Sequence, residues 1–214
     1  MNLLHLDSSA LGDFSASREL TRELAERLRA GHPGAKYRYR DLAAAPPAHV
    51  TGTLLGALRS QQPAAAELEP ELNLTDELLR EFLAADVVVV GAPMYNFSIP
   101  STLKAWIDRV AQAGKTFRYT ANGPEGLAGG KRVIIVSTRG SMMAGTPHEA
   151  AMDHQEAYLR TVFGFFGITD IEVLRAEGIG LGPEARSEAL ARAHQQVPRI
   201  AARGTEQRGV ALAG

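Results

Sequence analysis

The sequence predicts an α/β fold built on a doubly wound, five-stranded parallel sheet. Five segments of strand length alternate with stretches whose apolar residues recur at helical spacing. Segments 86–90 and 131–138 each contain an uninterrupted run of four apolar β-branched residues, which is typical of strands buried on both faces. The chain has 214 residues, of which 45% are hydrophobic, so it is long and apolar enough for one such domain.

The first part of the chain is predicted to form a β-α-β unit followed by a long excursion. Residues 2–7 and 36–41 are the expected strands, the second at an edge, and a helix over about 17–30 connects them. Residues 43–71 are rich in Ala and Pro, and only a short helix over about 53–60 is expected there.

The middle of the chain is organised around a decapeptide that follows an apolar strand. Thr75 is the expected N-cap of the preceding helix, with acidic residues in its first turn. Strand 86–90 then leads into Gly91–Pro100, a loop stiffened by two prolines, and a helix is predicted over 101–110.

The rest of the chain supplies two further strands and two helices. An aromatic excursion with turns is expected at 112–130, followed by a strand at 131–138 and a loop at 139–145. A helix over about 152–166 and a strand at 168–176 come next. A turn at 178–183 then leads into a closing helix over about 184–203, irregular at Pro198. We expect residues 1–204 to form a single domain and residues 205–214 to form a flexible tail.

Strand order 2-1-3-4-5, as in flavodoxin-like proteins, fits this succession best. It brings the loops 8–17, 91–100 and 138–145 to one crevice at the carboxyl ends of strands, where open α/β sheets bind ligands. The first loop offers serine hydroxyls at a helix start, which suits a phosphate; a capped helix with solvated serines is the alternative. The second loop offers a thioether, aromatic rings and an amide, which suit a flat ring with a polar edge.

Composition and missing motifs remove several other classes of protein. The formal net charge of −1 does not favour nucleic acid or an anionic membrane as a partner, and the absence of cysteine excludes disulfides and thiolate metal sites. No basic leader or membrane-length apolar run is seen, so a cytoplasmic protein is expected. The chain has no P-loop and no nucleophile elbow. Its glycine-rich 178–182 segment follows the last strand and is interpreted as a turn. His148-Glu149 lacks the second histidine of a zinc motif, so no metal is expected.

Several motifs together resemble the bacterial FMN-dependent NADH-azoreductase family. They include Phe14-Ser-Ala-Ser17, Pro93-Met-Tyr-Asn-Phe97 with Ile99-Pro-Ser-Thr-Leu-Lys104, Thr116-Phe-Arg-Tyr119 and Thr138-Arg-Gly-Ser141. The match runs from about residue 2 to 203 in the order of the family. The resemblance implies a flavodoxin-like homodimer with FMN at the subunit interface.

The resemblance also assigns cofactor contacts position by position. It implies phosphate contacts at Ser9, Ser15, Ala16 and Ser17, a border of the isoalloxazine at Met94, Tyr95, Asn96 and Phe97, and the pyrimidine edge of the ring at Thr138, Arg139, Gly140 and Ser141. The chain departs from the family at two places. Ala16 stands where members often have Gln, and Thr138–Ser141 stands where they often have Ser-Arg-Gly-Gly.

The implied activity is ping-pong reduction of a quinone or azo compound by NADH or NADPH through bound FMN, with no essential acid-base side chain. Phe117, Tyr119 and Phe165 are the candidates for an apolar acceptor pocket. Two alternatives remain open: a flavodoxin-like electron carrier without its own substrate, and a flavin-free regulatory or scaffold module. The sequence selects neither the nicotinamide nor the natural acceptor.

Overall fold

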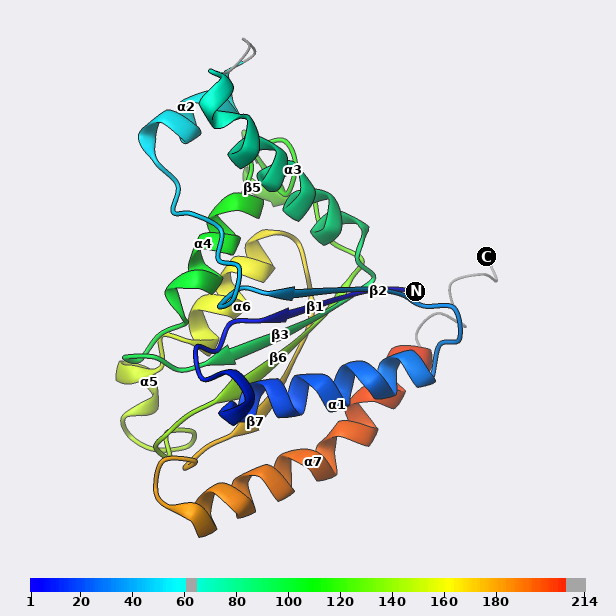
Figure 1. Ribbon diagram of the computed structural model, residues 1–214, viewed down its shortest axis with the longest axis vertical. Helices are drawn as coiled ribbons and strands as arrows, with labels where there is room; N and C mark the ends of the chain where they lie inside the picture. The colour runs from blue at the N-terminus through cyan, green and yellow to red at the C-terminus, as the bar shows by residue number, and fades with distance from the viewer. Residues whose placement is uncertain (61–64, 207–214) are drawn as a thin grey trace.

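A five-stranded parallel sheet forms the centre of the computed structural model, which describes residues 1–60 and 65–206 (Figure 1). The strand order is β2-β1-β3-β6-β7, which confirms the predicted fold and the predicted order. The strands are β1 (Asn2–Asp7), β2 (Lys36–Asp41), β3 (Val87–Pro93), β6 (Arg132–Thr138) and β7 (Asp170–Ala176).

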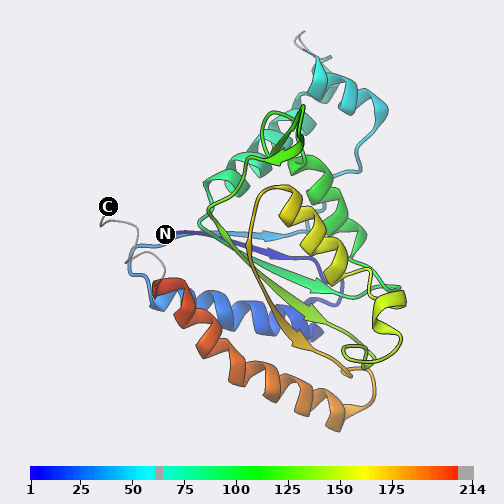
Figure 2. The same ribbon diagram turned by 180° about the vertical axis from the view of Figure 1, so that it is seen from behind.

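Helices cover both faces of this sheet (Figures 1 and 2). One face carries α1 (Ala16–Ala30) and α7 (Pro183–Glu206). The other carries α3 (Glu69–Ala84), α4 (Ser101–Val110) and α6 (Glu156–Phe165). The short helices are η1 (Gly12–Phe14), α2 (Gly52–Arg59), η2 (Ala66–Leu68) and α5 (Glu149–Met152).

The two faces of the sheet bury separate apolar clusters. In β3, Val88 and Val90 pack with Trp106 and Phe163 on the α4 and α6 side, whereas Val87 and Val89 pack toward α1 and α7. Alternate residues of one strand therefore belong to opposite cores, which is why the run of four valines has no polar side.

Strand β3 is longer than predicted. Gly91, Ala92 and Pro93 pair with the last three residues of β6, although the sequence placed them in a loop. On the other neighbouring strand, β1, a Cβ on Gly91 would lie 2.6 Å from Asp7 Oδ1, so the buried Asp7 carboxylate could not keep its place beside a larger residue. The loop itself therefore begins at Met94.

The predicted N-cap at Thr75 is wrong. Helix α3 begins at Glu69, with Pro70 in its first turn, and Thr75 lies inside it. The Thr75 hydroxyl donates to the carbonyl oxygen of Glu71 (2.7 Å) and accepts from Arg109 Nη1 (2.7 Å). A threonine whose hydroxyl bonds to the carbonyl oxygen four residues earlier lies inside a helix and does not mark its start.

Two further helix predictions need correction. The expected helix over 152–166 is interrupted at Asp153–Gln155, because the Asp153 carboxylate accepts from the backbone N–H groups at the start of α6. Helix α7 continues through Pro198 to Glu206, because Val197 and Ile200 are buried against the α1 side. Residues 205 and 206 of the predicted tail are thus helical, and 207–214 lie outside the described residues.

The aromatic excursion forms an antiparallel hairpin of β4 (Phe117–Thr120) and β5 (Gly123–Gly126). The hairpin packs closely on the end of α6, where a Cβ on Gly126 would lie 2.1 Å from Gly167 N. It follows the carboxyl end of α4 and therefore lies away from the loop at which α4 begins (Figure 2).

Candidate functional site

Three loops meet at the carboxyl ends of β1, β3 and β6, as the sequence predicted, and polar contacts join them. The backbone N–H of Met94 donates to the carbonyl oxygen of Thr138 (2.8 Å), which links the second loop to the third. The Tyr95 hydroxyl accepts from the N–H of Ala10 (3.0 Å), which links the second loop to the first. The three loops therefore form one connected surface at the strand ends.

The first loop ends in the N-terminus of α1. Ser15 is the N-cap, and its hydroxyl accepts from the N–H of Arg18 (3.3 Å) and bonds to the Ser17 hydroxyl (3.0 Å). Ser9, Ser15, Ala16 and Ser17 are all buried there. Because α1 has 15 residues, its dipole and first-turn N–H groups favour an anion at this end.

Arg18 has a role that the sequence did not reveal. Its Nη2 and Nε donate to the carbonyl oxygen of Ser9 (2.9 and 3.3 Å). The same guanidinium binds both oxygens of Asp41 at 2.6 Å. Hydrogen bonds from Arg18 hold the pKa of Asp41 below its usual value, so this pair stays ionised. The guanidinium therefore anchors the loop from behind through its backbone.

The second loop contains a tight, strained turn. Tyr95 and Ser98 exchange backbone hydrogen bonds of 2.9 and 3.0 Å, and Asn96 (φ 48°) and Phe97 (φ 71°) occupy the two central positions of a type I′ geometry. A left-handed φ at a bulky residue costs on the order of 1–3 kcal/mol. The N–H of His154 donates to the carbonyl oxygen of Phe97 (3.0 Å) and holds this turn in place.

The third loop rests on the glycine-rich segment that follows β7. The N–H groups of Gly178, Ile179 and Gly180 donate to the carbonyl oxygens of Ser141, Arg139 and Gly140, at 3.2, 3.1 and 2.9 Å. A Cβ on Gly180 would lie 3.1 Å from the Gly140 oxygen, so glycine permits the close approach. The predicted turn is therefore a backbone support for the candidate ring contacts.

The Arg139 side chain points away from the crevice. It is 1% exposed, and its guanidinium binds Asp153 (2.7 Å), Glu156 (2.8 Å) and Glu177 (3.1 Å). This guanidinium is therefore committed to carboxylates inside the protein. Of the four predicted residues Thr138–Ser141, Arg139 can offer a ligand only its backbone.

The candidate acceptor-pocket residues do not join the loops within one chain. Phe117 and Phe165 contact one another, with ring centroids 4.6 Å apart, and Tyr119 packs edge-on against Phe117. Phe117 and Tyr119 line a hollow of about 470 Å³ beside the carboxyl end of α4. Because α4 has 10 residues and begins just after the second loop, about 15 Å of helix separates the two places.

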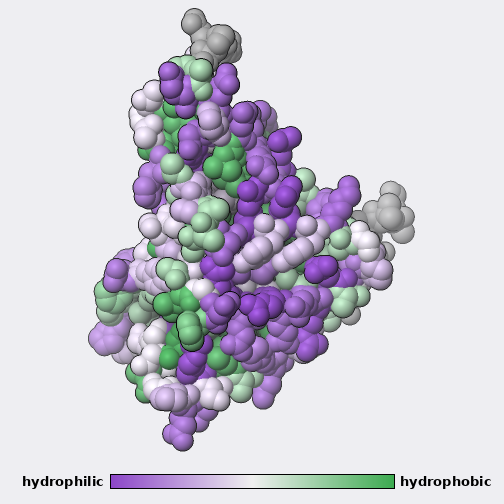
Figure 3. All heavy atoms as spheres, in the orientation of Figure 1, coloured by the Kyte–Doolittle hydropathy of each residue, from purple (hydrophilic) through white to green (hydrophobic). Residues whose placement is uncertain are grey.

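Exposed apolar side chains surround the three loops. Figure 3 shows an apolar patch over the loop between β1 and α1. The exposed large apolar residues on the three loops and the segment supporting them are Leu11, Phe14, Phe97, Met142 and Leu181. Phe14 is 84% exposed and Leu181 is 65% exposed. Several large exposed apolar side chains at one edge are typical of a surface that contacts a ligand or another protein.

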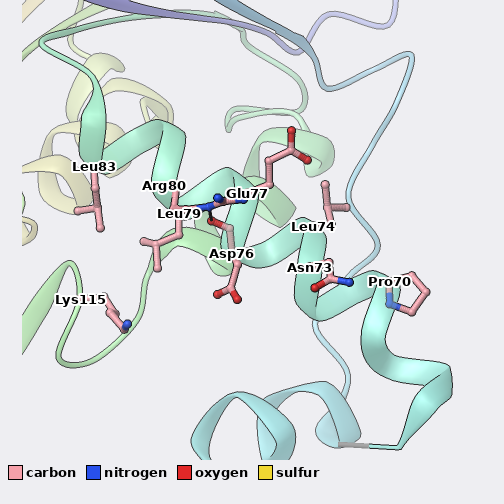
Figure 4. A pocket seen from close by; sticks show the side chains of 9 residues that line it. All are labelled: Pro70, Asn73, Leu74, Asp76, Glu77, Leu79, Arg80, Leu83 and Lys115. Carbon is pink, nitrogen blue, oxygen red and sulfur yellow. Dashed lines mark hydrogen bonds between the residues drawn. The ribbon is translucent and has the colours of Figure 1, made fainter.

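A separate hollow of about 810 Å³ lies between α3 and Lys115 (Figure 4). Leu79 and Leu83 contribute its apolar part, and Asp76 and Arg80 contribute charges. None of its lining residues comes from the carboxyl ends of the sheet strands, because all of them except Lys115 belong to α3. The three loops are therefore the better candidate site.

The parallel sheet and the three joined loops at its switch point define a flavodoxin-like protein, and residues 1–200 match the family described as flavodoxin-like fold. An FMN-dependent NADH:quinone oxidoreductase of Azospirillum brasilense is 56% identical over 203 residues, which cover 94% of this chain and 98% of the relative. FMN-dependent NADH:quinone oxidoreductase 2 of Pseudomonas aeruginosa is 58% identical, with 92% and 96% covered. The chain belongs to the family of FMN-dependent NADH:quinone oxidoreductases.

A solved structure supports the same family. The FMN-dependent NADH-azoreductase of Bacillus anthracis, in complex with FMN, superimposes with a TM-score of 0.87 at 25% identity and covers 95% of this chain and 99% of its own. The family resemblance inferred from the loop motifs is thus confirmed. In the part of the chain that the structure describes, no helix has the length and apolarity to cross a membrane.

Proposed function

We propose that this protein is an FMN-dependent oxidoreductase that passes two electrons from NADH to a quinone or azo acceptor. The observation that carries the proposal is the joining of three loops, with the chemistry of a phosphate site and of a ring site, at the switch point of the sheet. The relatives described above bear the same activity in their names.

The residues present fit the phosphate of FMN. The buried hydroxyls of Ser15 and Ser17 stand at the start of α1, with the backbone of Ala16 between them, and the buried Ser9 lies at the other end of the same loop, just after β1. Hydroxyls, N–H groups and a helix dipole stabilise a phosphate dianion without a cation in the loop. Arg18 is turned to the back of this loop and is paired with Asp41, so its charge is already compensated.

The other two loops fit the isoalloxazine ring. Met94–Phe97 offer a thioether, two aromatic rings and the Asn96 amide, and the adjacent loop Thr138–Ser141 offers backbone groups. The Asn96–Phe97 turn is fixed by its own hydrogen bonds and by His154, so its backbone is oriented before a ring arrives. Such fixed orientation lowers the entropy lost on binding.

Bound FMN supplies a ring that takes a hydride from NADH and returns two electrons to the acceptor. The protein would orient that ring between Met94–Phe97 and Thr138–Ser141. Backbone N–H groups near Gly140 would stabilise negative charge at the pyrimidine edge of the ring. Exposed Phe14 and Phe97 would exclude water from the reacting face. No side chain of the chain is assigned an acid-base role.

Anaerobic mixing tests this activity. The FMN-loaded protein should lose the visible absorbance of its flavin when NADH is added. It should regain that absorbance when a quinone is added. A yellow protein that NADH does not bleach would instead be an electron carrier. A colourless protein that does not take up added FMN would contradict the cofactor assignment. Parallel runs with NADPH would establish the preferred nicotinamide.

We also propose that the protein acts as a homodimer. Phe117, Tyr119 and Phe165 lie too far from the loops of their own chain to border its ring, so they can form an acceptor pocket only from a second copy. The apolar residues around the loops and the 74% exposed Tyr119 support a contact of this kind. Sedimentation equilibrium should give twice the chain mass of 22.9 kDa. A monomer with full quinone reductase activity would refute the proposal.

A further inference from the structure

A fully buried amide joins the second and third loops from behind. Gln155 is 0% exposed and lies just before α6. Its Nε2 donates to the carbonyl oxygen of Ala92 near the end of β3 (2.6 Å). Its Oε1 accepts from the Ser137 hydroxyl (3.0 Å) and from Arg139 Nε (3.0 Å), at the end of β6. One side chain thus bridges the two strands whose loops carry the proposed ring contacts.

The same network continues to the far side of the third loop. The guanidinium of Arg139 also binds Glu177, and Glu177 Oε1 accepts from the N–H groups of Met143 and Ala144 (3.3 and 3.0 Å). The loop is therefore held at both of its ends by groups connected to Gln155. A shift of the Gln155 amide would be transmitted to both ends.

The backbone around Gln155 contacts the strained turn as well. Asp153 Oδ1 accepts from the N–H groups of Gln155 and Glu156, both at 3.0 Å, which fixes the break between α5 and α6. Within that break, the N–H of His154 donates to the carbonyl oxygen of Phe97 (3.0 Å). The three residues 153–155 therefore contact the second loop through backbone and the third through side chains.

We propose that Gln155 is a positioning residue for the flavin ring, setting the distance between the second and third loops across the ring-binding crevice. The inference rests on the proposed function. An amide is required, because the position needs one donor toward Ala92 and one acceptor toward Ser137 and Arg139. A carboxylate lacks the donor, and an aliphatic side chain lacks both.

The fold itself does not depend on this bridge. Strands β3 and β6 are paired along their whole length, from Val87 with Arg132 to Pro93 with Thr138. Loss of the Gln155 amide therefore leaves the sheet intact and acts on the loops beyond it. A buried carbonyl left without its donor should shift the loop equilibrium and weaken FMN binding by about 10- to 100-fold.

The test compares Gln155→Met, which keeps length and apolar volume, with two reference variants. Thr75→Val removes from α3 a buried hydroxyl that contacts Arg109 of α4, away from the loops. Ser15→Ala alters the proposed phosphate side only. The readouts are the Kd for FMN from flavin fluorescence quenching, the visible spectrum of bound FMN, and Tm without FMN. Ser137→Ala, which removes one bond to Gln155 Oε1, is a milder fourth variant if Gln155→Met does not fold.

We expect Gln155→Met to raise the Kd for FMN and to shift the flavin absorption bands, and Ser137→Ala to do both to a smaller extent. Thr75→Val should lower Tm with Kd unchanged, and Ser15→Ala should raise Kd with the bands unchanged. A Gln155→Met protein that binds FMN with wild-type Kd and spectrum would overturn the positioning role alone. Failure of the wild-type protein to bind FMN would instead overturn the proposed function.

Discussion

Replacing Arg18 with Met tests whether the first loop is held in its phosphate-binding form from behind. The substitution removes two hydrogen bonds to the Ser9 carbonyl oxygen and the bidentate pair with Asp41. Met keeps much of the apolar stem, so lost packing contributes little. The hydroxyls of Ser15 and Ser17 are untouched, which separates loop position from phosphate contact.

The expected size follows from the geometry. Hydrogen bonds that involve a charged group contribute about 1.5–3 kcal/mol net. If that amount holds the Ser9 carbonyl in place, its loss reduces the binding-competent fraction of the protein by the same free energy. The Kd for FMN then rises by about 10- to 150-fold, because apparent affinity scales with that fraction. The upper end applies only if no other contact compensates.

Fluorescence quenching of FMN gives this Kd directly, and Arg40→Met is the matched control. Arg40 belongs to β2 and also forms ion pairs, with Glu77 and Glu81, but it contacts none of the three loops. Both variants should unfold at a lower temperature than wild type, because Arg18→Met leaves Asp41 without its cation and Arg40→Met does the same to Glu77, although Arg38 still pairs with Glu81. A Kd for Arg18→Met equal to that of Arg40→Met would refute the anchoring role.

Two further outcomes are expected. Tyr95→Phe removes the acceptor for the N–H of Ala10, so FMN affinity should fall by about 2- to 12-fold, measured by the same titration; an unchanged affinity would mean that water replaces the hydroxyl. His194 lies between Glu19 and Glu23 at the contact of α1 with α7. Burial opposes its charge, but the hydrogen bonds that the charged imidazole donates to both carboxylates outweigh burial and raise the pKa of His194. Its stabilising contribution is therefore complete below the unfolded-state pKa of about 6.5 and is lost as pH rises through the folded-state pKa. When Tm is measured from about pH 5.5 to 8.5, the wild-type protein should show this loss and His194→Gln should not. The same dependence of Tm on pH in both proteins would contradict the role of His194.

The sheet and the three loops were predictable because their signals are local. Continuous β-branched runs mark β3 and β6, and each is followed by turn-forming residues at its carboxyl end. The position of α3 was harder to predict, since Thr75 looks like a cap until its hydroxyl is seen bonding to Glu71 inside the helix. In sequence, a threonine before acidic residues is equally compatible with an N-cap and with a position inside the helix.

The supports behind the loops had no such signal. Arg18 and Gln155 act on backbone carbonyls, those of Ser9 and Ala92, and a backbone partner leaves no trace in residue type. Gly178–Gly180 was interpreted as a turn because only the fold brings it against Gly140. The family resemblance assigned Arg139 to the ring edge by its position alone, whereas three carboxylates distant in sequence draw its side chain inward.

Helices α1 and α7 lie side by side on one face of the sheet although almost the whole chain separates them (Figure 2). Leu20 and Leu24 of α1 belong to the same buried apolar cluster as Ala193 and Val197 of α7. During synthesis, this cluster therefore cannot be completed until α7 has left the ribosome. Nascent chains that stop short of residue 183 lack the α7 part of this cluster, so its remaining apolar residues would be left partly exposed and should be held by chaperones that bind apolar segments.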